Sequence, residues 1–155
     1  MTGPFNMTSK HAQQGSLLLE ALIAFLIFSM AILGVIGLQA TAINNTLDAR
    51  YRSDAAFLAN QIIAQIWTDA DSTTSPSVIK ASYACAPCKS NNGNANTRDW
   101  VTQIQSGFLP GVTDAANQPS IEIAGNQVTV TLRWQAPQGQ QQAHNYVTKT
   151  EIRFN

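Results

Sequence analysis

Hydrophobic and polar positions divide the chain into three regions with different spacings. Residues 21–38 are almost all apolar. Over residues 44–68 the apolar side chains recur every three or four positions, the spacing of one face of a helix. After residue 120 they alternate with polar ones, which is typical of half-buried strands. The pattern therefore predicts an α+β protein with a long N-terminal helix and a small antiparallel sheet.

The uninterrupted apolar run is long enough to cross a membrane. A helix of about 20 apolar residues spans the roughly 30 Å hydrocarbon core of a bilayer, and no charged residue occurs from Ala21 to Leu47. Lys10 and His11 precede residue 16 and no acidic residue does, so the positive-inside bias predicts a cytoplasmic N-terminus. We expect residues 16–43 to form a single membrane span, with the remainder outside.

Residues 44–68 are predicted to continue the same helix as an amphipathic half. No proline interrupts it, and a continuous helix would be on the order of 80 Å long, far more than a membrane requires. This half should lean on a globular partner through its apolar stripe. The stripe consists of Leu47, Tyr51, Ala55, Leu58, Ile62 and Ile66.

Residues 69–155 are expected to form a globular head. Turn-forming residues at 69–76 end the helix, and a connecting region runs to Thr97, a candidate cap for a short helix that Gly107 ends. A hairpin with its turn at 124–126 and a last strand from Tyr146 to Phe154 complete a sheet of at least three strands. The inward hairpin residues are expected to be Ile121, Ile123, Val128, Val130, Leu132 and Trp134, and those of the last strand Ile152 and Phe154. Trp67, Trp100 and Trp134 are expected to be buried in whole or part.

Charge and candidate ligands point to no enzyme and no cofactor. Nine basic and nine acidic residues cancel, which gives no electrostatic case for binding nucleic acid. His11 and His144 show no metal-ligand spacing with the cysteines, so no metal site is predicted. The chain also lacks a phosphate-binding glycine loop, a nucleophile elbow and a catalytic Ser, His and Asp arrangement.

The two cysteines, Cys85 and Cys88, favour a structural disulfide that clamps a loop, because the head is predicted to lie in an oxidising compartment. The Cys-x-x-Cys spacing can also lower a thiol pKa, which leaves a redox role as an alternative. No βαβ pattern flanks the pair, as a thioredoxin-like site would require. Free thiols and intermolecular pairing are further alternatives.

The N-terminus admits three interpretations: a secretory signal, a plain membrane anchor or a prepilin leader. Ala40-Thr41-Ala42 is a small-x-small site that would suit signal cleavage. Against that interpretation, the apolar run exceeds the roughly 7–15 residues of a signal peptide, and Glu20 lies inside it. A carboxylate there is costly, so Glu20 either reaches the headgroups or has a function.

The segment Gly15-Ser16-Leu17-Leu18-Leu19-Glu20 resembles the processing motif of type IV prepilins. The resemblance implies that residues 1–15 are a leader, that a membrane prepilin peptidase cuts after Gly15, and that the new terminus at Ser16 is methylated. Most members have Phe or Met where this chain has Ser16. Glu20 would pair with the terminal ammonium of a neighbouring subunit and set its axial register, since the two charges offset each other's desolvation. An alternative start at Met7 would shorten the leader.

More of the chain is similar to the PilV-type minor pilins. The similar segments are residues 32–39, 52–56, 58–59, the Trp100 helix, 109–111 and 128–134. This resemblance implies a pilin fold and a non-enzymatic subunit of the inner membrane and then of the pilus, which primes assembly at or near the tip. Its partners would be other minor pilins, the major pilin, the inner-membrane pilus assembly machinery and membrane lipid. A type II secretion pseudopilin is the nearest alternative, and a membrane-tethered periplasmic redox or binding module is a different class.

Gly34 and Gly37 fall in the upper part of the predicted span. Each weakens a helix by about 1 kcal/mol relative to alanine. Two interpretations fit them: close packing between membrane helices, or local flexibility, because a comparable zone of major pilins unwinds when the subunit enters the filament.

Overall fold

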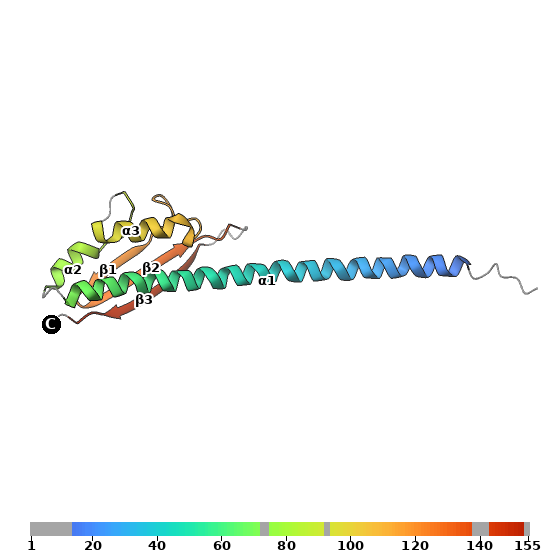
Figure 1. Ribbon diagram of the computed structural model, residues 1–155, viewed down its shortest axis with the longest axis horizontal. Coiled ribbons are helices and arrows are strands. Elements are labelled where there is room, and N and C mark those ends of the chain that lie inside the picture. Colours follow the sequence, from blue (N-terminus) through green and yellow to red (C-terminus); the bar gives the residue numbers. More distant parts are fainter. Residues whose placement is uncertain (1–13, 72–74, 92–93, 138–142, 154–155) are drawn as a thin grey trace, which may run out of the picture. The chain divides into compact units, whose positions relative to one another are not determined.

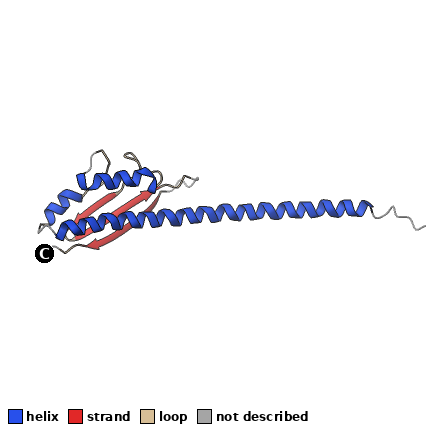
Figure 2. Ribbon diagram, viewed as in Figure 1, coloured by secondary structure: helices blue, strands red, loops and turns tan. Residues whose placement is uncertain are grey.

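The computed structural model describes residues 14–71, 75–91, 94–137 and 143–153. Figure 1 shows the order of the elements. They are the helices α1 (Gln14–Asp71), α2 (Pro76–Tyr83) and α3 (Ala95–Gln103), the π-helical turn η1 (Ile104–Phe108), and the strands β1 (Ser120–Ala124), β2 (Gln127–Trp134) and β3 (His144–Glu151). The long N-terminal helix and the three-stranded antiparallel sheet confirm the α+β prediction (Figure 2).

The chain divides into two units, residues 1–45 and 46–155, and α1 contributes to both. In the first unit every side chain from Ser16 to Asn45 is exposed. This part of α1 is long and apolar enough to cross a membrane. Its apolar side chains bury nothing within the chain, which is compatible with a single-pass membrane anchor.

The second unit, which we call the head, has its own hydrophobic core. The predicted stripe of α1 supplies one wall: Ala55, Leu58, Ile62 and Ile66 are fully buried, and Tyr51 packs against them. Side chains three or four residues apart lie on one face of a helix, and here that face meets the apolar face of the sheet. The helix ends at Asp71, inside the turn-forming segment that was predicted to stop it.

The sheet has the order β1-β2-β3, with antiparallel pairs throughout. A two-residue turn joins β1 to β2, because Ala124 pairs with Gln127. Gly125 takes a φ of 59° there, as the first position of a type II′ hairpin turn requires. All six hairpin side chains predicted to face inward are buried. Ile152 is also buried, just beyond β3, while Phe154 lies outside the described residues.

Two details of the short helices differ from the sequence predictions. The connecting region contains α2, whose helical pattern is only Ile79 and Tyr83, four residues apart. Helix α3 begins at Ala95 with Asn94 as its cap residue, so Thr97 is not the cap. Thr97 is instead buried in the first turn, and its hydroxyl donates to the carbonyl oxygen of Asn94 at 3.1 Å.

The three tryptophans differ in how deeply they are buried. Trp134 and Trp100 are buried in the core as predicted. Trp67 is 52 % exposed, so it is at most half buried and lies outside the core. The reason is its position directly after Ile66: one step along a helix turns a side chain by about 100°, away from the buried stripe.

Candidate functional site

The predicted processing segment lies in the first turns of α1. Gly15 has helical backbone, and Ser16 and Glu20 are exposed at positions four apart, which places them on the same side of the helix. The ion pairs among the described residues are Arg50–Asp54 and His144–Asp48. Glu20 therefore has no cationic partner within the described part of the chain. If this helix enters lipid, water at the headgroups or a cation from another molecule must stabilise the carboxylate.

Two hydroxyl side chains of the apolar segment have hydrogen-bond partners inside the helix. The Ser29 hydroxyl donates to the carbonyl oxygen of Phe25 at 2.7 Å, and the Thr41 hydroxyl donates to that of Gly37 at 3.2 Å. Such bonds to the preceding turn let a hydroxyl enter an apolar environment without losing its hydrogen bond. Glu20 is the charged side chain among residues 16–45, and a charge in an apolar environment needs a partner more than a neutral side chain does.

Gly34 and Gly37 lie in uninterrupted helix, and a Cβ atom added at either would meet nothing within 4 Å. Nothing described within the chain therefore requires glycine at these positions. Both earlier interpretations stay open, since close packing against another helix and local flexibility each concern something beyond the single folded chain.

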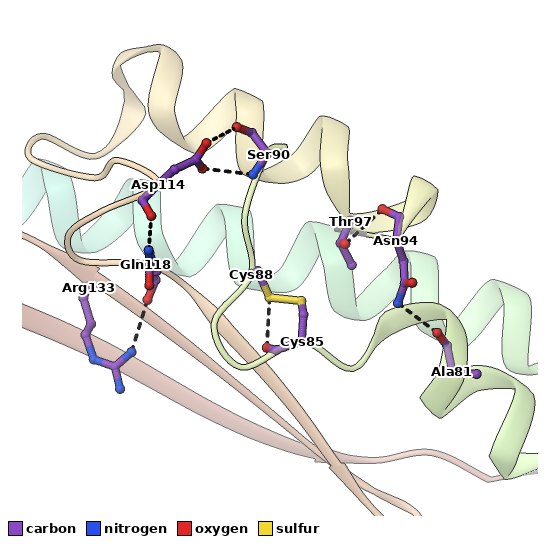
Figure 3. Close-up of a disulfide and its surroundings, with 9 residues drawn as sticks. All are labelled: Ala81, Cys85, Cys88, Ser90, Asn94, Thr97, Asp114, Gln118 and Arg133. Atoms are coloured by element: carbon purple, nitrogen blue, oxygen red, sulfur yellow. Dashed lines mark hydrogen bonds between the residues drawn. A yellow bond between two sulfur atoms is a disulfide. The ribbon is translucent and has the colours of Figure 1, made fainter. Parts of the chain in front are cut away.

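The disulfide loop covers the outer edge of β1. Cys85 and Cys88 are disulfide-bonded (Figure 3). Their Cα atoms are 4.8 Å apart. Cys85 exchanges two backbone hydrogen bonds with Ile121, at 3.0 and 2.8 Å, and the Cys88 amide donates to Pro119 at 2.8 Å. Because the loop occupies backbone groups that an edge strand would otherwise expose, the disulfide acts as a loop clamp.

A carboxylate that the sequence analysis missed fixes the next part of this loop. The Asp114 carboxylate accepts hydrogen bonds from the Ser90 amide at 3.0 Å, the Ser90 hydroxyl at 2.8 Å and the Gln105 side-chain amide at 2.8 Å. Figure 3 shows the pair with Ser90 beside the disulfide. The bond from Gln105, followed by those from Ser90, lowers the pKa of Asp114 because each favours the charged form.

Two hydrogen bonds attach the short helices to α1. The indole N–H of Trp100 donates to the carbonyl oxygen of Leu58 at 2.9 Å in the core. The buried Tyr83 hydroxyl donates to the carboxylate of Asp69. Burial first, and then the bond to Asp69, raise the pKa of Tyr83, since both disfavour the phenolate. Side chains from α2 and α3 thus attach these two short helices to α1, at Leu58 and Asp69.

One recess of the described surface, with a volume of about 530 Å³, lies between the end of α1 and the end of β3. It is lined by Trp67, Thr68, Asp71, Glu151, Ile152 and Arg153. Among the described residues, no group of three or more His, Cys, Asp or Glu side chains could hold a metal ion.

Comparison with protein-family models, curated proteins and solved structures finds no match to this chain. The function of this chain therefore has to be inferred from its own residues. Gly15, Ser16 and Glu20 lie together on the first turns of α1, and the two cysteines form one loop. Asp114 went unnoticed because its partners are 24 and 9 residues away. The turn residues Thr113 and Asn117 were the sequence signal for a structured loop around Asp114. In that loop the Thr113 hydroxyl accepts hydrogen bonds from two backbone amides.

Proposed function

We propose that this chain is a minor pilin of a type IV pilus, cleaved after Gly15 and held in the inner membrane before assembly. The observation that carries the proposal is Glu20: one carboxylate, four residues after Ser16, on an otherwise uncharged apolar helix whose other half is built into a separate head. Assembly would move the apolar half from lipid into the core of a filament. Its partners are then other minor pilins and the major pilin.

Two features of the described residues support this proposal. The exposed apolar half of α1 needs an apolar environment that the head does not supply. The carboxylate of Glu20 needs a cation from outside the described residues, and the terminal ammonium of a neighbouring subunit would provide one. This pairing would form only at the correct axial offset between subunits, so it would select the register.

The test measures how much of the chain enters surface filaments. Wild type, Glu20→Gln and Glu20→Asp chains are expressed at equal levels, and both the sheared filament fraction and the membranes are probed. We expect Glu20→Gln to remain in membranes and to be strongly depleted from filaments, with Glu20→Asp partly retained because it keeps the charge. Equal incorporation of wild type and Glu20→Gln would contradict the assigned role of Glu20.

The same experiment separates the pilus from its nearest alternative. A type II secretion pseudopilin would be missing from sheared surface filaments even as wild type, and its deletion would block release of a secreted protein while surface pili persist. For the redox alternative, the test is alkylation with and without reductant together with a dithiol oxidation assay. An inert, fully formed disulfide removes that alternative; turnover of dithiols that requires both cysteines would favour it.

A further inference from the structure

Strand β3 forms one edge of the sheet, and β1 forms the other (Figure 1). The edge at β1 is covered by the disulfide loop through the backbone bonds of Cys85 and Cys88. β3 has eight residues in unbroken register with β2, and it contains neither proline nor glycine. Proteins usually protect so long an edge, because its unpaired backbone groups can bind another strand. Among the described residues, no comparable backbone bonds cover the outer edge of β3.

The backbone groups of this edge can be assigned residue by residue. The Ile152 amide donates at 2.7 Å to the carbonyl oxygen of Asn126, which the register of β2 and β3 places directly opposite. In an antiparallel pair, every second residue exchanges its backbone bonds with the residue opposite, and the residues between them point their N–H and C=O groups away. Counting back from Ile152, the even-numbered residues of β3 bond to β2. The groups on the outer edge therefore belong to Asn145, Val147, Lys149 and Glu151.

This row of donors and acceptors matches one kind of ligand. Successive residues of a strand rise about 3.4 Å, so the outward groups repeat at intervals of about 7 Å. A second extended polypeptide repeats its own N–H and C=O groups at the same interval, and it can therefore satisfy the whole row by adding to the edge. The backbone of β3 thus identifies an extended segment of protein as the ligand that fits this edge.

The exposed side chains of the edge indicate what that segment should carry. Val147 is 49 % exposed, Lys149 has a positive charge and Glu151 a negative one. The ion pairs among the described residues involve neither of these two charges. Directly opposite residues of a sheet favour apolar pairs and unlike charges. The complementary segment therefore has an apolar residue opposite Val147, an acidic residue opposite Lys149 and a basic residue opposite Glu151.

The side chains between these positions would point to the other face of the sheet, beside α1. The recess at the end of α1 is lined there by Trp67 and Ile152 among others, and its lining residues include none from β2. It therefore lies on the side of β3 that a fourth strand would occupy. Trp67 is 52 % exposed. An apolar side chain opposite Thr150 or Ile152 would cover the indole and remove apolar surface from water.

We propose that the outer edge of β3 binds an extended segment of a partner protein, which adds to the sheet as a fourth, antiparallel strand. From its N-terminal end, the segment presents a basic, an acidic and an apolar residue to Glu151, Lys149 and Val147, with apolar residues between them for the recess. A second copy of β3 could match the charges, but the two α1 helices would then run in opposite directions. Two chains anchored in one membrane by that helix cannot adopt this arrangement. The inference does not rest on the chain being part of a pilus.

The test uses the full chain in detergent micelles and a synthetic peptide of about ten residues with this pattern. Hydrogen exchange is followed by NMR for single amides of β3. Without peptide, the amides of residues 146, 148 and 150 should be protected by their bonds to β2, and those of residues 145, 147, 149 and 151 should exchange freely. At a peptide concentration about ten times its Kd, exchange of the second set should slow about tenfold.

Variants at one position separate the backbone bonds from the charge. Lys149→Pro removes an amide that points out of the sheet, so β3 keeps its bonds to β2 and the peptide should bind about tenfold more weakly. Lys149→Ala keeps that amide and loses only the charge, so binding should weaken about twofold. A peptide with its acidic and basic residues exchanged should bind wild type about threefold more weakly, and should recover its affinity for the Lys149→Glu, Glu151→Lys double variant.

Three results would overturn the proposal. One is unchanged exchange of residues 145, 147, 149 and 151 in the wild-type chain at every soluble concentration of the peptide, a measurement that needs no variant. Another is equal binding of the peptide to wild type and to folded Lys149→Pro protein, which would place the peptide elsewhere. The third is protection of the same four amides without peptide that rises with protein concentration, which would identify a second copy as the ligand of this edge.

Discussion

The two halves of α1 have opposite relations to the rest of the chain. Leu22 in the apolar half is 68 % exposed, while Leu58 in the amphipathic half is fully buried against the sheet and the short helices. Both are leucines in one helix, so helix propensity does not distinguish them. The head is therefore stabilised by its own core, whereas the apolar half needs an environment, lipid or other subunits, that the described part of the chain does not provide.

Truncating a leucine in each half of α1 tests whether only the amphipathic half stabilises the head. Leu58→Ala should destabilise the head by about 2–5 kcal/mol, because it leaves a cavity in the core. Leu22→Ala should leave the unfolding of the head unchanged, since its side chain is exposed and belongs to the other unit of the chain. Urea unfolding of the full chain in detergent, followed by tryptophan fluorescence, measures both. Equal losses for the two variants would contradict the independence of the head core.

The disulfide should have the next largest effect on the stability of the head. Opening a loop this short removes about 2 kcal/mol of stabilisation on chain-entropy grounds, and it also releases the backbone bonds to Ile121 and Pro119 at the edge of β1. Reductant should therefore lower the stability of wild type to that of the Cys85→Ser, Cys88→Ser double variant, and should not affect the variant. A reductant effect of the same size on the variant would show that the loss arises elsewhere.

The attachment of α2 to α1 should contribute less. Tyr83→Phe keeps the ring but loses the hydrogen bond to Asp69, and we expect a cost of about 1 kcal/mol. The raised pKa of Tyr83 also sets a pH dependence. Its contribution is present below the ordinary tyrosine pKa of about 10 and is lost as the pH rises above it. Urea unfolding between pH 8 and 11 should therefore show a shallower alkaline decline for Tyr83→Phe than for wild type.

Asp114 should give the smallest effect at neutral pH and the clearest one in acid. Its lowered pKa means that its contribution is present above the ordinary value of 3.8 and is lost as the pH falls through the lowered pKa. Asp114→Asn should remove part of this acid-induced loss of stability. Asp99→Asn, on the exposed side of α3, is the matched control. Parallel acid profiles for wild type and Asp114→Asn would exclude this network as a pH-dependent contributor.

The sequence predicted the elements whose signal is local and repeated. The apolar run, the stripe from Tyr51 to Ile66 and the alternation from Val128 to Trp134 each repeat a period several times, so each predicts both an element and its buried face. Helix α2 was not predicted because two buried residues do not establish a period. The burial of Trp67 was overestimated because a large aromatic residue favours the core, whereas its position beside the stripe turns it outward.

The candidate site shows the same limit. Gly15, Ser16 and Glu20 can be recognised because their meaning lies in their spacing along one helix. The Asp114 network and the contact of Asp48 with His144 bring together residues from separate elements. Each of those residues is an ordinary polar residue in its own segment. Only the folded head places them within hydrogen-bond or ion-pair distance.

The most direct test of the central claim is the intact mass of the mature chain, from cells with and without the prepilin peptidase. The pilin proposal predicts a terminus at Ser16, with or without one methyl group, that appears only when the peptidase is present. A terminus after Ala42 would instead identify an ordinary secreted protein. The apolar half of α1 would then be absent from the mature molecule, and the role assigned to Glu20 would be contradicted.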